Sequence, residues 1–449
     1  MDKLSELPQV ETIVSDSQLS HWIRILGRPR VVDVVRSVLH EIRGMILHGQ
    51  SIDGIQAIID QVAQVCQSSE RMHPIRVVNC SGILIHTNLG RSPLSESVWD
   101  AVKEANCRYT NLEFNLSTGK RGNRADISSD LLHHMTGSED AIVVNNNAAA
   151  LFLLLAAVAK GKRVLVSRGE LVQIGGGFRI HEIMQQSGAE LVEVGTTNIT
   201  TVSDYVNALD ENTAMVLKVH RSNFSIHGFT NEASVDELAK AIGRRAILAV
   251  DQGSGAHDNS VPGEISTRTL FKQGADIITF SGDKLIGSVQ IGCICGKTKI
   301  VKQLAKHPLY RVLRPGKTVL SIFEHTLIDR LNTIPSVPGS FFKRSMNELR
   351  EMGNSIISIT GNEQLALVES PMAFGGGSDP EGEYPSVAIK IDSLHNPHQI
   401  LKMLRDRPIP IIAIIIDSKV HLHLAAVFDD EITIIASAIR DVLKDLACI

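Results

Sequence analysis

Three polar side chains follow three apolar runs of the sequence, each at the point where the run ends. Lys284 comes just after Ile277–Phe280, Asp251 closes a second run, and Asn223 closes a third. Partial burial disfavours the charged form of a lysine, lowers its pKa and frees the amine to attack a carbonyl carbon. A lysine after a strand is more often a solvated loop residue, so the interpretation of Lys284 depends on its companions.

The elements that must position these side chains alternate along residues 126–300. Short apolar runs, typical of buried strands, are separated by amphipathic segments of helical period. This alternation predicts an α/β fold with a mostly parallel sheet and helices on both faces. Ligands of such sheets bind at the carboxyl ends of the strands, so the three side chains should share one edge. The predicted strands are 141–144, 163–167, 190–194, 215–219, 247–251, 277–280 and 291–295.

An aspartate, an asparagine and a lysine at one sheet edge match the needs of pyridoxal phosphate. The lysine can carry the aldehyde as a Schiff base, and the carboxylate can keep the pyridine nitrogen protonated, so that the ring accepts electrons. The asparagine amide can donate to the phenolate oxygen. Asn146, Asn147 and Ala148 begin an apolar helix after Val144, and the N–H groups of a helix start can bind the phosphate. A plain N-cap by one asparagine is the alternative interpretation.

The sequence motifs of other enzyme classes are absent from this chain. No Gly-x-Gly-x-x-Gly opens a helix after a predicted strand, and no Walker-type loop is present, which disfavours nicotinamide and nucleoside-triphosphate enzymes. The pairs Cys293/Cys295 and His421/His423 have a spacing of two, but no further ligands accompany them, so we expect no metal site.

Composition places the chain among ordinary globular proteins. Its 449 residues are 43% hydrophobic and 21% charged, with a formal net charge of −4. Six scattered cysteines without a C-x-x-C pair suggest reduced thiols. Neither a signal peptide nor an apolar run of membrane-spanning length is visible, so we expect a cytoplasmic protein without a membrane segment.

We expect three domains, from the change of pattern along the chain. Residues 1–73 show only helical periods, 74–334 carry the alternating pattern, and 335–449 mix helices with strands in an α+β arrangement. In the last part, one strand is predicted over Ile411–Ile416. The first part has more acidic than basic residues, yet five arginines fall within 24–43: Arg24, Arg28, Arg30, Arg36 and Arg43. They are either a solvated helix surface or a surface that holds a phosphate backbone.

Arginines also lie near the predicted catalytic edge. Arg91 ends a polar turn after residues 76–90, and Arg311 and Arg314 follow the segment that contains Lys284. Guanidinium groups suit phosphate or carboxylate ligands.

Several motifs together resemble the bacterial selenocysteine synthase family, the L-seryl-tRNA(Sec) selenium transferases. The resemblance spans about residues 7 to 440, and the N-terminal helical part resembles that family's tRNA-binding domain. The matching stretches are His86–Arg91, Asn145–Ala150, Ser167–Val172, Val194–Asn198, Gly228–Thr230, Ser281–Leu285 and His307–Leu309.

This resemblance implies a pyridoxal-phosphate enzyme of fold type I, in the bacterial cytoplasm, as a homo-oligomer of ten subunits. It implies conversion of L-seryl-tRNA(Sec) to selenocysteinyl-tRNA(Sec) through a cofactor-bound dehydroalanyl intermediate, with selenophosphate as the selenium donor. The roles implied for single residues are these: Lys284 holds the cofactor, Asp251 faces the ring nitrogen, Asn223 lies on the ring, Asp283 sits beside the lysine, and Arg91, Arg311 and Arg314 face selenophosphate or the seryl group.

The chain departs from the family pattern at positions where arginines are usual. Ile199 replaces one, Ala413-Ile414 stands where a Gly-Arg pair is expected, and Ala425 replaces another. Lost arginines weaken anion recognition, so two alternatives stay open. One is a pyridoxal-phosphate lyase or transferase of a free or phosphorylated amino acid, and the other is an inactive tRNA-binding paralogue.

Overall fold

The computed structural model describes residues 7–48, 54–70, 72–171, 173–174, 178–221 and 224–447. The chain divides into two compact units, Met1–Val77 and Val78–Ile449. The predicted boundaries at 73/74 and 334/335 stay predictions. Within the described ranges, no helix combines the length and the apolar character needed to cross a bilayer.

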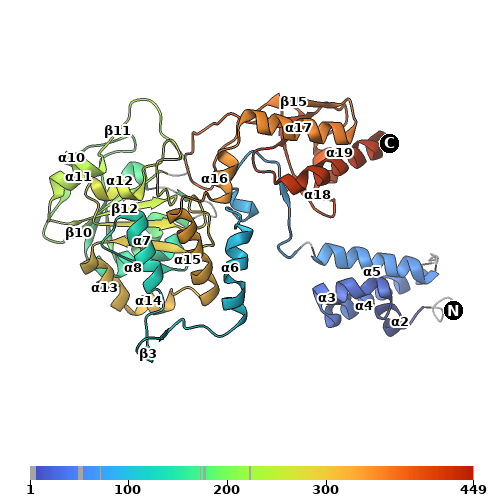
Figure 1. Cartoon of the computed structure of the whole chain (residues 1–449), viewed down its shortest axis with the longest axis horizontal. Coiled ribbons are helices and arrows are strands. Elements are labelled where there is room, and N and C mark those ends of the chain that lie inside the picture. Colours follow the sequence, from blue (N-terminus) through green and yellow to red (C-terminus); the bar gives the residue numbers. More distant parts are fainter. Residues whose placement is uncertain are drawn as a thin grey trace. The chain divides into compact units, whose positions relative to one another are not determined.

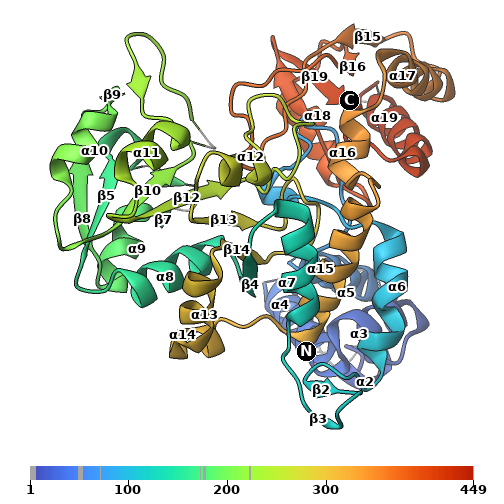
Figure 2. The same cartoon turned by 60° about the vertical axis from the view of Figure 1, so that its left-hand side comes forward.

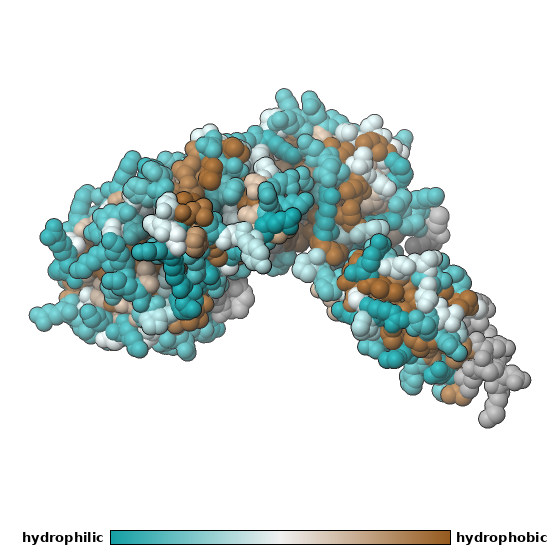
Figure 3. Space-filling model, turned by 60° about the horizontal axis from the view of Figure 1, so that its bottom comes forward, coloured by the Kyte–Doolittle hydropathy of each residue, from teal (hydrophilic) through white to brown (hydrophobic). Residues whose placement is uncertain are grey.

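The first unit is a helical bundle with its own core. Gly27 has φ 82° and separates α3 from α4, and Pro29 in the first turn of α4 helps the new helix begin. Buried Val35 and Ile42 of α4 pack in one cluster with Ile59 of α5. The helical prediction for this region is confirmed. In the space-filling view, the molecular surface shows apolar patches among hydrophilic ones (Figure 3). The elements of the first unit are α2 (Val10–Val14), η1 (Ser17–Leu19), α3 (Ser20–Leu26), α4 (Arg28–Leu47) and α5 (Gly54–Glu70).

All five arginines of residues 24–43 are exposed on this unit. Two of them pair with acidic neighbours, because Arg28 lies 2.7 Å from Glu11 and Arg36 lies 3.4 Å from Asp33. Exposed ion pairs contribute little to stability, so these guanidinium groups stay available to a polyanion.

A seven-stranded sheet forms the centre of the second unit, in the order β4-β14-β13-β12-β10-β5-β8 (Figure 2). Strands β13, β12, β10, β5 and β8 are parallel, and β14 runs antiparallel to both β13 and β4. All seven predicted strands are present, with ends shifted by at most two residues. They are β4 (Asp140–Val144), β5 (Arg163–Ser167), β8 (Glu190–Val194), β10 (Thr213–Val219), β12 (Ile247–Gly253), β13 (Ile277–Ser281) and β14 (Gly292–Gly296).

Helices cover both faces of this sheet, which explains why the strand sequences are almost wholly apolar (Figures 1 and 2). One face packs against α8 (Asn147–Val158), α9 (Ile180–Ser187) and α13 (Thr298–Lys306). The other packs against α7 (Asp126–Thr136), α10 (Val202–Ala208), α11 (Val235–Ile242), α12 (Thr267–Lys272) and α15 (Lys317–Leu331). Two further helices are α6 (Glu96–Cys107), beside α15, and α14 (Pro308–Val312).

A separate core lies beneath a four-stranded antiparallel sheet near the C-terminus, of order β15-β16-β19-β18. The single strand predicted over Ile411–Ile416 is wrong, because the chain changes sheets at Ala413. Strand β17 pairs with β1, whereas β18 pairs with β19. The elements are β1 (Val78–Asn79), β15 (Leu365–Glu369), β16 (Val387–Ile391), β17 (Ile411–Ile412), β18 (Ile414–Ile416), β19 (Lys419–His423), η5 (Asp429–Glu431), α16 (Val337–Phe342), α17 (Met346–Thr360), α18 (Pro397–Arg405) and α19 (Ile432–Ala447).

Short elements occupy the loops around the large sheet. They are η2 (Thr87–Leu89), η3 (Arg168–Glu170) and three two-stranded pairs: β2 (Phe114–Asn115) with β3 (Lys120–Arg121), β6 (Gln173–Ile174) with β7 (Phe178–Arg179), and β9 (Ile199–Thr200) with β11 (Asn231–Glu232).

Close backbone packing at Gly292 fixes the start of α8. In the sheet register, Gly292 of β14 lies between Ser281 of β13 and Val144 of β4. A Cβ atom on Gly292 would lie 2.0 Å from the carbonyl oxygen of Asn146. Only glycine lets the N-terminus of α8 settle against the strand at this edge.

Replacing Gly292 by alanine should therefore destabilise the second unit. We expect Gly292→Ala to lower the free energy of unfolding by about 2–3 kcal/mol, because two backbones must separate, and calorimetry measures the change. Gly44→Ala in α4 is the control. Its Cβ would meet nothing within 4 Å, so we expect a gain of about 0.5–1 kcal/mol from helix propensity. Similar effects of the two substitutions would contradict the packing argument.

Candidate active site

Lys284 lies in the turn that follows β13, as predicted. The turn is compact, since a Cβ on Gly282 would lie 2.4 Å from the side chain of Ile291. The hydroxyl of Ser92 donates to the carbonyl oxygen of Lys284 at 2.6 Å and holds the backbone there. Burial lowers the pKa of the Lys284 amine, and the nearby Arg91 cation lowers it further. The amine is therefore prepared to act as a neutral nucleophile.

Asp251 is a buried carboxylate within β12, 8% exposed. The Nδ2 group of Asn147 donates to its Oδ1 atom at 2.8 Å, and the hydroxyl of Thr279 donates at 2.9 Å. Burial raises the pKa of Asp251, and the two hydrogen bonds and the Lys284 charge oppose that rise. Both hydrogen-bond donors are neutral, so a cationic N–H group facing this carboxylate would be strongly stabilised.

The start of α8 differs in detail from its predicted role. Asn146 is the N-cap, and its side chain accepts from the N–H of Ala149 at 2.8 Å. The side chain of Asn147 turns to Asp251, and its Oδ1 atom is buried without a hydrogen-bond partner among the described residues. The backbone N–H groups of Asn147 and Ala148 are thus the groups left to meet an anion at this helix start.

Arg91 and Asp283 form an ion pair beside Lys284, at 2.5 Å. The hydroxyl of Ser281 donates to the other carboxylate oxygen of Asp283 at 2.9 Å. Arg91 has φ 65°, an unusual conformation for a residue other than glycine, held by the hydrogen bond from its N–H to the carbonyl of His86. The structure therefore brings Arg91, Asp283 and Lys284 together.

Arg311 and Arg314 occupy a different place. Arg311 is exposed on α14, and Arg314 lies 3.6 Å from Glu113, which also pairs with Arg124. Leu313 accepts a hydrogen bond from the N–H of Asn145, which ties this segment to the end of β4. Across the described ranges, no hydrogen bond or ion pair joins either arginine to Lys284, so their roles stay predictions. Asn223 lies outside the described residues.

Sequence reasoning missed a pair at the same edge, formed by the half-buried His220 and the buried Glu264. The Nε2 atom of His220 lies 3.3 Å from Glu264, and the N–H of His220 donates to the carbonyl of Asp251. Burial raises the pKa of Glu264, but His220, the hydroxyl of Ser254 and the N–H of Asp379 outweigh burial and hold it below its usual value. His220 could have been found from the sequence, because it directly follows the predicted strand 215–219. Glu264 falls in an irregular segment, where no sequence pattern marks its position.

The positions that lack the usual arginines are structurally ordinary. Ala425 is fully buried in an apolar cluster with Ile85 and Phe374. Ile199 lies in the short strand β9, and Ile414, at the position of the usual arginine, lies in strand β18. An apolar residue is well accommodated at each of these positions. The histidines and cysteines with a spacing of two lie within β19 and β14, and among the described residues no three metal-ligating side chains come together.

Comparisons with known proteins agree with the sequence motifs. The family model described as L-seryl-tRNA selenium transferase matches residues 77–428, and the model described as selenocysteine synthase N terminal matches residues 4–43. Proteins named L-seryl-tRNA(Sec) selenium transferase from Campylobacter fetus and Geobacter sulfurreducens are each 38% identical. The first match covers 96% of both chains, and the second covers 98% of this chain and 99% of the relative.

A solved structure shows the same architecture. D-Glucosaminate-6-phosphate ammonia-lyase matches with a TM-score of 0.61 and 19% identity, covering 83% of this chain and 96% of that chain. This likeness concerns the fold alone. The predicted fold class, α/β of pyridoxal-phosphate fold type I, is confirmed, as is the family resemblance.

The electrostatics of Lys284 give a pH-dependent prediction for protein that carries no pyridoxal phosphate. The amine reacts only when neutral, so its labelling by pyridoxal phosphate and borohydride should rise as the pH passes its pKa. We expect the midpoint to move upward in Arg91→Ala, which loses a cation that lowers this pKa, and downward in Asp283→Asn, because the Asp283 carboxylate raises it. Peptide mass spectrometry measures labelling, with exposed Lys103 as the internal reference. Shifts in the same direction would contradict this account.

Proposed function

The chain belongs to the L-seryl-tRNA selenium transferase family, and from this premise we propose that it converts L-seryl-tRNA(Sec) to selenocysteinyl-tRNA(Sec). The observation that carries the proposal is the joint match of both units. The catalytic part matches over residues 77–428, and the N-terminal helices match over residues 4–43. We propose that the N-terminal helices hold the tRNA, a role that an enzyme of free amino acids would not need. Their presence therefore favours seryl-tRNA as the substrate over the free amino acid of the lyase alternative.

We further propose that the sheet edge holds pyridoxal phosphate through Lys284, Asp251 and the N–H groups of Asn147 and Ala148. The fit rests on the chain's own chemistry: a partly buried amine with a lowered pKa, and a buried carboxylate whose hydrogen-bond donors are neutral. Asn146 shapes the helix start, and Asn223, which we propose to lie on the cofactor ring, comes four residues after β10 in the sequence. When bound, pyridoxal phosphate supplies an aldehyde that captures the substrate amine and a ring that stores an electron pair.

Each protein group at the edge then has a definite task. Lys284 Nζ removes the α-proton of the seryl group once its amine is free. Asp251, fixed by Asn147 and Thr279, holds a proton at the ring nitrogen. Arg91, paired with Asp283, would offer a guanidinium to an anionic selenium donor such as selenophosphate.

The remaining assignments extend the same proposal. Arg311 and Arg314 act on the selenium donor or the seryl group, and the protein works as a homo-oligomer in the cytoplasm. The presence of Lys284 and Asp251 at one sheet edge disfavours the inactive paralogue, because a chain without catalysis has no reason to desolvate an amine close to a buried carboxylate.

The proposal is tested by turnover of purified protein with seryl-tRNA(Sec) and selenophosphate. Wild type should form selenocysteinyl-tRNA, Lys284→Ala should form none, and Asp251→Ala should be slower by about 10²-fold or more, because a neutral ring stores charge poorly. Exposed Asp130→Ala is the matched control and should keep the wild-type rate. Unchanged turnover in Asp251→Ala would remove this carboxylate from the mechanism.

The tRNA assignment is tested by deleting the first unit. A protein beginning at Val78 should keep borohydride-trapped cofactor on Lys284 and lose affinity for tRNA, measured by filter binding. In the full chain, Arg28→Gln with Arg30→Gln should weaken tRNA binding. The slope of log K against log salt concentration should become shallower by about 0.7 for each phosphate contact that is lost. Arg244→Gln, an exposed arginine of the second unit, is the control. Equal tRNA binding by the full and shortened proteins would overturn the assignment.

A further inference from the structure

A cavity of about 320 Å³ lies between the segment that follows β12, the end of α15 and the start of α16. Its volume falls within the range of small-molecule sites, about 300–1,000 Å³. Leu285, the residue after Lys284, forms part of the wall, so the cavity borders the turn that carries the reactive lysine. The other wall residues that matter for a ligand are His257, Asp258, Arg330, Phe342, Lys343 and Phe374.

Arg330 brings a buried cation to this wall, since it is only 8% exposed. Within the described ranges, its guanidinium donates one hydrogen bond, to the carbonyl oxygen of Ile334, and forms no ion pair, and its Nε atom is buried without a hydrogen-bond partner. Burial lowers the pKa of Arg330, although Asp329 and Asp258 act in the opposite direction. An anion that accepts from the remaining N–H groups would stabilise such a cation.

The other titratable groups of the wall leave it with a net positive charge. Lys343 adds a second cation, and Asp258 is the one carboxylate among the described residues that line the cavity. Asp258 lies 3.7 Å from His257 and is exposed to solvent. Burial lowers the pKa of His257, and the Arg330 charge lowers it further against the effect of Asp258, so the imidazole is neutral at pH 7. Two cations therefore face one carboxylate.

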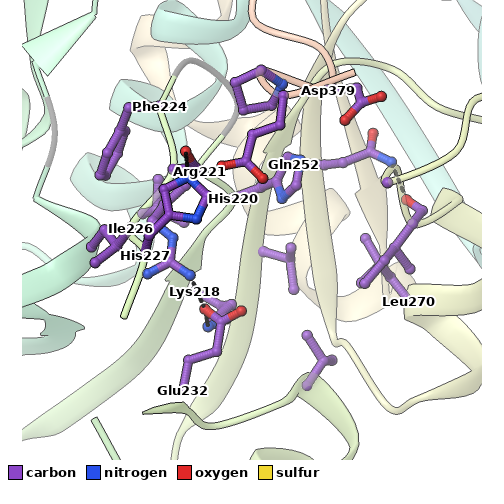
Figure 4. A pocket seen from close by; sticks show the side chains of 18 residues that line it. Lys218, His220, Arg221, Phe224, Ile226, His227, Glu232, Gln252, Leu270 and Asp379 are labelled. Carbon is purple, nitrogen blue, oxygen red and sulfur yellow. Dashed lines mark hydrogen bonds and ion pairs between the residues drawn. The ribbon is translucent and has the colours of Figure 1, made fainter. Parts of the chain in front are cut away.

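The cavity at the ends of β10 and β12 shows the opposite arrangement (Figure 4). There, Lys218 and Arg221 each lie 3.0 Å from Glu232. An anion in that cavity would compete with a carboxylate for cations that already have a partner. The guanidinium of Arg330 has no such competitor, which favours an anionic ligand in the cavity beside Leu285.

Apolar groups form much of the remaining wall. Phe342 and Phe374 both line the cavity, and their ring centroids lie 4.6 Å apart. Pro335 and Leu285 add further apolar surface. Aromatic and aliphatic surfaces of this kind bind the apolar part of a ligand, whereas a few polar groups fix its orientation. The wall therefore suits a molecule that combines an acidic group with an apolar or aromatic body.

We propose that this cavity binds a small organic anion, with its carboxylate or phosphate group at the guanidinium of Arg330 and its apolar body against Phe342 and Phe374. None of the wall residues is among those that we assign to the cofactor, the selenium donor or the tRNA, so the ligand is additional to those of the proposed reaction. Because Leu285 directly follows Lys284, the bound anion contacts the turn that carries the reactive amine.

Calorimetric titration of the full-length holoenzyme tests the proposal with benzoate, phenyl phosphate, benzamide and inorganic phosphate. We expect the better of the two aromatic anions to bind at least about tenfold more tightly than benzamide, which lacks the charge, and than inorganic phosphate, which lacks the ring. Which aromatic anion binds better shows whether the site prefers a carboxylate or a phosphate. Arg330→Gln should abolish this binding, and Arg91→Ala should keep it, because Arg91 does not line the cavity.

Two exposed wall residues give variants that leave the core intact. Lys343→Gln removes a cation and should weaken binding of the aromatic anion by about two- to fivefold, whereas Asp258→Asn removes the carboxylate and should strengthen it by a similar factor. Lys402→Gln, at an exposed lysine of α18 outside the cavity, is the matched control and should have no effect.

Three results would overturn the proposal. The first is equal affinity of the wild type for the aromatic anions and benzamide, or for the aromatic anions and inorganic phosphate. The second is binding that persists in Arg330→Gln. The third is a change of the same sign in Lys343→Gln and Asp258→Asn, which would show that the charges of the wall do not act on the ligand.

Discussion

The hydrogen bonds to Asp251 hold together the sheet edge that carries Asp251 and Lys284. A carboxylate taken out of water is costly unless its environment returns the lost solvation. Here Asn147 of α8 and Thr279 of β13 each donate to Asp251 of β12, so one acidic group joins two strands and a helix. The strand register places Asp251 directly beside Thr279, and Gly292 lets the start of α8 come close enough for Asn147 to reach the carboxylate. The position of Lys284 follows from that same register.

The charged groups around this edge are arranged in pairs. Arg91 meets Asp283, Lys218 meets Glu170, and His220 meets Glu264. Each pair lets a partly or fully buried ion persist, because its partner supplies the interaction that water would have supplied. The edge can therefore hold several ionised groups, while Lys284, which forms no ion pair within the part of the chain that the structure describes, has its pKa lowered by burial and by Arg91.

Much of this arrangement was predictable from the sequence because strand ends are local signals. The runs before Asp251 and Lys284 are short, apolar and bounded by turns, and their placement at one edge follows from the topology of parallel sheets. The pairing of Asn147 with Asp251 was not predictable, since a side-chain rotamer at a helix start depends on how closely β14 packs. Glu264 and Asp379 meet across irregular segments, where no period marks the position of a side chain. The break at Ala413 was missed because consecutive isoleucines give no sign that the chain changes sheets.

The ion pair between Arg91 and Asp283 joins residues 192 positions apart in the sequence. Contacts of such long range form late, since the intervening chain must be ordered before the two ends can meet. During synthesis on the ribosome, the N-terminal helices and the first strands emerge well before Lys284 does. The growing chain therefore has its helical unit available to fold while the catalytic edge is still incomplete, and the reactive lysine enters its surroundings only once most of the large sheet has been made.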